Sequence, residues 1–173
     1  MKEFGGQPLF LNKNDINTDE IIPAKYLTEN TKIALKPHIL EDLHLKGFDP
    51  GKDIAGKNII VSRANFGCGS SREHAVWVFE VNNINVVIAE SFARIFRQNM
   101  FNCGMLAIEL PGEDIESLFG MGPDVTIKID MEHNQITAEN SRGEKKDIPF
   151  ELNSFDRELV QAGGWLAYAD KKY

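Results

Sequence analysis

The segment of residues 65–74, NFGCGSSREH, places a cysteine between two glycines and follows it with two serines and an arginine. Hydroxyl groups, a guanidinium and the free backbone N–H groups of a helix start can all donate hydrogen bonds to a carboxylate or a phosphate. The glycines carry no side chain, so a ligand can approach the backbone closely there. The pattern favours an anion-binding loop built on Ser70, Ser71 and Arg72.

A purely structural role accounts for part of the same segment. Ser70 and Glu73 have the Ser-x-x-Glu spacing of a capping box, in which the serine hydroxyl accepts from the backbone of residue 73 and the glutamate reaches back. A cap needs only one serine, however, and the helix dipole disfavours a cation such as Arg72 in the first turn. The pattern alone leaves both roles open.

Two further polar segments accompany this one. Residues 91–99, SFARIFRQN, offer Ser91 and Arg94 after the next apolar segment, although Arg94 and Arg97 could equally form ion pairs or a solvated helix face in this acidic chain. Residues 14–30, NDINTDEIIPAKYLTEN, are rich in carboxylates and amides. In that segment Asp19 can orient a catalytic group or merely form an Asx-turn.

Short apolar segments alternate with helical patterns in the middle of the chain. Residues 57–62, 85–89 and 106–110 predict buried strands, and residues 71–80 and 91–102 predict helices between them. This alternation indicates parallel strands with helices packed on the sheet. The polar segments would then lie at the carboxyl ends of the strands, where open α/β sheets bind ligands.

The last third of the chain has a different pattern. Residues 124–139 alternate apolar and polar side chains around a Glu-His-Asn turn, which is typical of a hairpin. Residues 155–167 predict a closing helix that Gly163 and Gly164 interrupt. We expect a single α/β domain over residues 1–173, with an antiparallel addition and no dividing linker.

Composition excludes several classes of function. The formal net charge of −7 argues against a protein that binds nucleic acid or an anionic membrane. No apolar run reaches the roughly 18 residues of a membrane span, and the N-terminus lacks the apolar core of a secretion signal, so we expect a cytoplasmic protein. Cys68 and Cys103 are too few to build a zinc or iron–sulfur site from this chain alone, and we expect no metal ligand in it.

Three segments together resemble the swivelling domain of the aconitase superfamily. They are DINTDEIIPAKYL at residues 15–27, NFGCGSSREHA at 65–75 and ESFARIFRQNMFNCG at 90–104, and they occur in the family's order and spacing. The resemblance covers roughly residues 5–165. A free-standing chain of this length is similar to the small subunits of isopropylmalate dehydratases and of related hydro-lyases, which include homoaconitases and enzymes of the dimethylmalate or maleate/citraconate type.

The resemblance implies a β/β/α fold with a mixed sheet and flanking helices. It also implies docking on a separate large subunit that carries a [4Fe–4S] cluster. The expected reaction, a step of leucine biosynthesis in the dehydratases, removes and re-adds water on a small hydroxy-carboxylic acid. By the same resemblance Ser70 is the base, acting as an alkoxide, and Asp19 matches an acidic active-site position. The residues expected to bind substrate are Ser71, Arg72, Gly69, Lys25 and Arg94.

One loop departs from the family pattern. Family members commonly carry an arginine after the Tyr-Leu pair, whereas residues 26–32 here read YLTENTK. Lys25 or Lys32 can supply a charge but not the two-pronged grip of a guanidinium, and Glu29 would repel an acidic substrate. An anion-binding module without catalysis therefore stays open. A serine hydrolase is disfavoured, because the Gly-x-Ser-x-Gly signature is absent.

Overall fold

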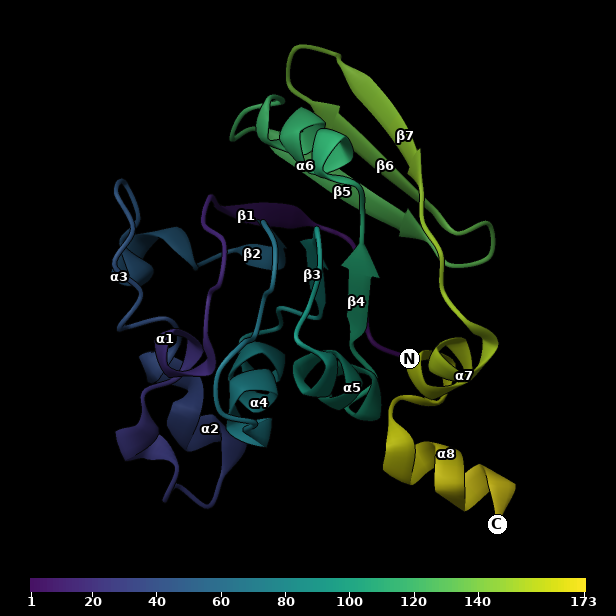
Figure 1. The fold of residues 1–173 in the computed structure, drawn as a ribbon. Coiled ribbons are helices and arrows are strands. Elements are labelled where there is room, and N and C mark those ends of the chain that lie inside the picture. Colours follow the sequence, from purple (N-terminus) through teal and green to yellow (C-terminus); the bar gives the residue numbers. More distant parts are fainter.

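The computed structural model describes residues 1–173, and a four-stranded parallel sheet lies at its centre (Figure 1). Its strands pair in chain order, and all three pairs are parallel. They are β1 (Gln7–Leu11), β2 (Lys57–Ser62), β3 (Val86–Ala89) and β4 (Leu106–Glu109). The three strands predicted from apolar segments are confirmed. All four residues of β3 are buried, as expected for a strand that is covered on both faces.

Two helices form the crossovers between these strands. Helix α4 (Glu73–Val81) joins β2 to β3, and α5 (Arg94–Asn102) joins β3 to β4. Right-handed crossovers between successive neighbouring strands put their helices on one face, and Figure 1 shows both on the same side of the sheet. Each helix begins two or three residues later than its sequence pattern indicates.

The opposite face is covered by a helix and a second sheet. Helix α6 (Gly112–Phe119) precedes an antiparallel sheet of β5 (Val125–Asp130), β6 (Gln135–Asn140) and β7 (Lys145–Pro149). The hairpin predicted over residues 124–139 is confirmed, whereas β7 and α6 were not predicted. Gly6 and Ile127 exchange two backbone hydrogen bonds of 2.9 Å and so join the two sheets. The layer order is therefore β/β/α.

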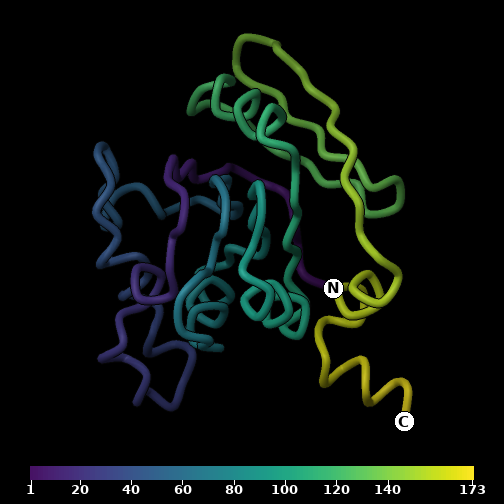
Figure 2. Tube along the Cα trace, in the orientation of Figure 1, coloured from purple at the N-terminus to yellow at the C-terminus, as the bar shows by residue number.

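A long excursion connects β1 to β2 and lies at one side of the sheet, coloured purple to blue in Figure 2. It contains the short elements α1 (Thr18–Ile21), η1 (Ala24–Tyr26), α2 (Lys32–Leu35), η2 (Lys36–His38) and α3 (Pro50–Asp53). At the other end the predicted closing helix is two helices, α7 (Ser154–Ala162) and α8 (Trp165–Lys172). Gly163 ends α7 in the left-handed conformation, with φ +91°. None of the helices is long and apolar enough to span a membrane.

Candidate active site

The parallel pairing continues beyond the strands into three loops. Gly67 donates its backbone N–H to the Ile16 carbonyl at 2.8 Å, and Thr18 donates to the Cys68 carbonyl at 2.9 Å. On the other side of the same loop, Phe66 donates to the Ser91 carbonyl at 3.0 Å. The loops that follow β1, β2 and β3 are thus joined in the order of their strands. They bring the three polar segments of the sequence to one edge.

The first of these loops is shaped by a capping box that we did not predict. The Asn17 side chain accepts from the Glu20 backbone at 2.8 Å, and the Glu20 carboxylate accepts from the Asn17 backbone at 3.0 Å. The spacing Asn-x-x-Glu was the available signal, but the Asn/Asp cluster favoured a turn. The cap starts α1 at Thr18 and holds Asp19 at the edge of the sheet.

Glycine is required at position 67 in the second loop. Gly67 has φ +82°, and a Cβ there would lie 2.2 Å from a ring carbon of Phe96. Any side chain would force this loop away from α5. The glycine therefore lets the second loop lie directly against the helix that carries Arg94.

The capping box that the spacing of Ser70 and Glu73 allowed is not formed. Arg72 is the N-cap of α4, with extended backbone and no side-chain cap. Residues 69–72 are not helical, and the first loop binds this segment, because the Thr18 hydroxyl donates to the Ser70 carbonyl at 2.8 Å. As a result, none of the backbone N–H groups of residues 70–74 donates to a backbone carbonyl. These free donors belong to the same segment as the two serine hydroxyls.

Arg72 is held by a carboxylate from the first loop. Its Nη1 donates to the Asp19 carboxylate, which is itself 64% exposed, whereas only 13% of the arginine side chain is exposed. Most of the Arg72 side chain is therefore fixed by packing while its partner remains open to solvent. Ser70 and Ser71 are both exposed beside this pair.

A cavity of about 260 Å³ lies where the loops meet. Its lining combines hydroxyls, two guanidiniums, glycine backbone and an apolar wall. The lining residues are Thr18, Gly67, Gly69, Ser71, Arg72, Ala93, Arg94, Ile95 and Phe96. Four predicted binding residues, Gly69, Ser71, Arg72 and Arg94, are therefore brought together. Ser70 and Asp19 adjoin the cavity in sequence but do not line it.

The two arginines of α5 differ in their surroundings. Arg97 lies 3.3 Å from the Asp156 carboxylate and 4.8 Å from the Phe101 ring centroid. Arg94 forms no ion pair, is exposed and faces the cavity. Of the two alternatives that we considered for both residues, the ion pair holds for Arg97, whereas an exposed Arg94 fits a solvated helix face as well as a binding role.

Lys25 is not brought to this cavity. Its Nζ lies 3.6 Å from the Glu41 carboxylate, which also accepts from the Tyr26 hydroxyl at 2.7 Å. The Tyr26 and His38 rings stack with their centroids 3.8 Å apart. The residues of this part of the excursion therefore contact one another and not the cavity. Burial opposes ionisation of Glu41, but hydrogen bonds from Tyr26 and His38 outweigh it and lower the pKa of the carboxyl.

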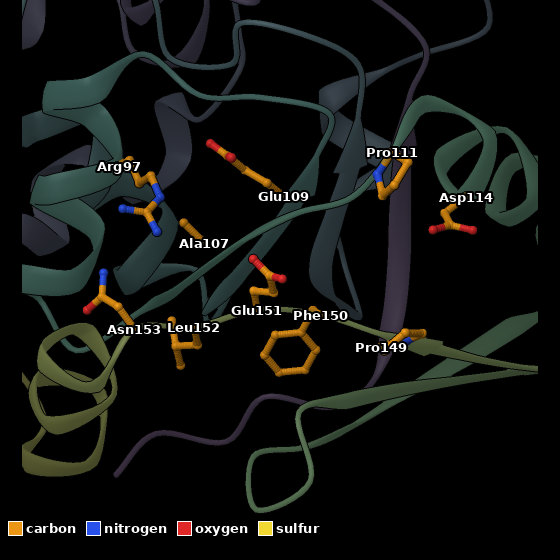
Figure 3. Close-up of a pocket in the computed structure, with 10 residues that line it drawn as sticks. All are labelled: Arg97, Ala107, Glu109, Pro111, Asp114, Pro149, Phe150, Glu151, Leu152 and Asn153. Carbon is orange, nitrogen blue, oxygen red and sulfur yellow. The ribbon is translucent and has the colours of Figure 1, made fainter.

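A larger cavity of about 760 Å³ lies between β4 and the segment after β7 (Figure 3). Glu109 and Glu151 direct their carboxylates into it, as the close-up shows, and Arg97 on its wall is already paired with Asp156. Because like charges repel, this lining disfavours an acidic ligand. We therefore assign the candidate site to the smaller cavity.

The chain's own residues do not fit an iron–sulfur cluster. No three His, Cys, Asp or Glu side chains are grouped so that they could hold a metal ion. The two cysteines are separate free thiols, and burial raises the pKa of Cys103 to about 11. Thiolates are the ligands of such clusters, so a buried, protonated thiol is unsuited to that role.

Comparison with known proteins decides the family. The family model described as "Aconitase C-terminal domain" matches residues 6–113, more than half of the chain. The chain belongs to this aconitase C-terminal domain family. The matched region contains all three loops of the candidate site.

Relatives of this aconitase-type domain are similar to the chain over most of their length. The 3-isopropylmalate dehydratase small subunit of Deinococcus deserti is 39% identical over 90% of this chain and 81% of its own. The isopropylmalate/citramalate isomerase small subunit of Methanocaldococcus jannaschii is 38% identical over 92% of this chain and 89% of its own. The crystal structure of 3-isopropylmalate dehydratase (leuD) from that archaeon aligns with a TM-score of 0.80 at 33% identity, covering 98% and 94% of the two chains.

Proposed function

We propose that this chain is the small subunit of a heteromeric hydro-lyase and that its activity is 3-isopropylmalate dehydratase. The enzyme would convert 2-isopropylmalate to 3-isopropylmalate by removing and re-adding water. The observation that carries the proposal is the cavity at which Ser71, Arg72 and Arg94 meet beside Ser70, in a chain whose relatives bear this name.

The proposed enzyme needs a large subunit, as the names of the relatives imply for those proteins. We propose that this partner carries a [4Fe–4S] cluster and all of its ligands, in keeping with the absence of a fitting ligand group here. This chain then contributes substrate binding and the movement of a proton.

Two guanidiniums at one cavity suit a substrate with two carboxylates. We propose that Arg72 binds one carboxylate with its fork of N–H donors, assisted by the Ser71 hydroxyl, and that Arg94 binds the other. Gly69 leaves room for this approach. The apolar wall of Ala93, Ile95 and Phe96 offers a surface for the alkyl group of the substrate.

Ser70 is the proposed base. In dehydration its oxygen takes the proton from the carbon next to the one that loses the hydroxyl, and in rehydration it returns that proton. A serine alkoxide is a usable base only if its charge is stabilised. The Arg72 charge and the free N–H groups of residues 70–74 are suited to that purpose.

Citramalate chemistry is a second candidate for the same site. The Methanocaldococcus jannaschii relative named for both isopropylmalate and citramalate favours it. The two substrates differ in the size of the alkyl group, which the apolar wall would contact. Lys25 pairs with Glu41 and Lys32 pairs with Glu80, and neither lines the cavity, so the two lysines considered do not replace the family arginine there.

The test removes the hydroxyl of Ser70, the proposed base, and compares the result with removal of the hydroxyl of Ser71. The chain is reconstituted anaerobically with a cluster-bearing large subunit, and turnover of 2-isopropylmalate and citramalate is measured. Ser70→Ala should lower kcat by roughly 10³-fold with substrate binding retained, because a general base contributes roughly that factor. Ser71→Ala should mainly raise KM. Full turnover by Ser70→Ala would refute the assignment, and substrate binding without turnover in the wild type would favour a binding module.

A further inference from the structure

Both hydrogen-bond donors of Thr18 bind the loop that carries Ser70. Its hydroxyl donates to the Ser70 carbonyl at 2.8 Å, and its backbone N–H donates to the Cys68 carbonyl at 2.9 Å. Only 2% of the residue is exposed, and it lines the cavity. A buried threonine whose hydroxyl reaches across 52 residues of sequence is therefore a direct link to the proposed base.

The adjacent residue makes a different kind of link. Asp19 binds Arg72 by charge, and its carboxylate is largely open to solvent. A substrate carboxylate that binds Nη1 of Arg72 competes with Asp19 for that donor. The bond from Thr18 to Ser70 has a neutral acceptor on the backbone, so substrate binding does not compete for it.

We infer that Thr18 is a positioning residue that holds Ser70 in place while Arg72 exchanges Asp19 for a substrate carboxylate. The inference rests on the proposed function, because the bond from Thr18 positions Ser70 only if Ser70 is the base of that reaction. A small displacement of a reacting group is costly in rate, so the loss of one anchoring bond should affect turnover more than binding.

The first variant removes the hydroxyl and keeps most of the shape. Thr18→Val should lower kcat roughly fivefold to tenfold, since a hydrogen bond of this kind contributes about 1 kcal/mol. KM should change less than about twofold. Thr18→Ser keeps the donor and should restore most of kcat, a rescue that simple loss of packing would not produce.

Ser62 provides a matched control. It is also fully buried, and its hydroxyl donates to the Leu11 carbonyl at 2.9 Å across 51 residues, but it lies within the sheet. Ser62→Ala should lower the melting temperature and leave kcat unchanged. If Thr18→Val behaves in the same way, the inference is overturned.

The link itself is tested without turnover. Hydrogen exchange is measured on the full chain without a large subunit, at the Gly67 amide, which donates to the Ile16 carbonyl. Exchange there should be faster than in the wild type in Thr18→Val and unaltered in Ser62→Ala. Equal exchange in both variants would also overturn the inference. Failure of the proposed function has a separate signature, which is the absence of turnover in the wild-type complex or its persistence in Ser70→Ala.

Discussion

Arg72 donates to the Asp19 carboxylate across 53 residues of sequence, which connects the loop after β2 to the loop after β1. The guanidinium is shielded and the carboxylate is exposed, so the pair resembles a fixed cation with a replaceable counter-ion. This asymmetry is what a site needs if a substrate carboxylate is to take the place of Asp19 without moving Arg72.

Asp19→Asn should lower KM by up to about fivefold, because the substrate carboxylate no longer has to displace a charged competitor from Arg72, which packing already holds in place. The melting temperature should change little, since ion pairs with an exposed partner contribute less than about 1 kcal/mol. Steady-state kinetics and thermal unfolding of the reconstituted enzyme measure both. Glu116→Gln is the matched control: Glu116 is 69% exposed and pairs with an Arg63 that is 18% exposed, outside the cavity. Equal kinetics for the two variants would contradict the role of Asp19.

Arg72→Lys should raise KM by roughly tenfold or more while the protein stays folded. Lysine keeps the charge but loses the planar fork that grips a carboxylate with two hydrogen bonds. Substrate titration of the reconstituted enzyme gives KM. Arg142→Lys, at an exposed pair with Glu144 outside the cavity, should have no such effect. An unchanged KM in Arg72→Lys would exclude bidentate binding at this residue.

Gly67→Ala should destabilise the fold by about 2 to 4 kcal/mol, because a Cβ would overlap the Phe96 ring in a left-handed conformation. Gly143 has nearly the same φ, +83°, and nothing within 4 Å of the added carbon. Gly143→Ala should therefore show only the conformational cost of about 1 kcal/mol. Urea unfolding measures both free energies, and equal losses would mean that the close approach to Phe96 is unimportant.

Glu80 should contribute to the free energy of unfolding in a pH-dependent way. Burial alone would raise the pKa of its carboxyl, but hydrogen bonds from Lys2 and Lys32 at 2.8 and 2.7 Å outweigh burial and hold the pKa below 4.5. A lowered folded-state pKa stabilises the protein above the unfolded value and loses this effect as the pH falls through the folded value. Glu80→Gln should therefore lower the urea midpoint at pH 7, and the difference should shrink below pH 4.5.

Glu132→Gln serves as the control in this comparison, since Glu132 is exposed and forms no ion pair. Its urea midpoint should follow the wild type over the whole range. A difference between Glu80→Gln and wild type that stays constant down to about pH 3 would mean that Lys2 and Lys32 do not act through the ionised carboxylate.

The sequence predicted the buried strands well because their apolar residues need no distant partner to be recognised. Val86–Ala89 is apolar throughout, and that is possible only for a strand covered on both faces. The parallel topology then predicts that Ser71, Arg72 and Arg94 share one edge. The predicted start of α4 was too early because bonds from residues distant in sequence, such as that from Thr18 to Ser70, bind the segment before Arg72 to the first loop.

Other features of the site depend on tertiary contacts that no local pattern encodes. Lys25 has the right charge and a plausible position in sequence, but it pairs with Glu41 and does not line the cavity. Thr18 is a single polar residue in a polar segment, and its importance depends on where the carbonyl of residue 70 points. Asn17 and Glu20 did offer a local signal, which the surrounding turn-forming residues obscured.

The hydrogen bonds that continue past β1, β2 and β3 also limit how such a site can be redesigned. An insertion in the loop after β2 would shift its register against both neighbours, and one in either outer loop would shift it against the middle loop, so the lengths of the three loops are mutually dependent. Grafting a new specificity from another enzyme would therefore require the transfer of all three segments as a set, with a single-loop exchange expected to cost folding before it altered selectivity.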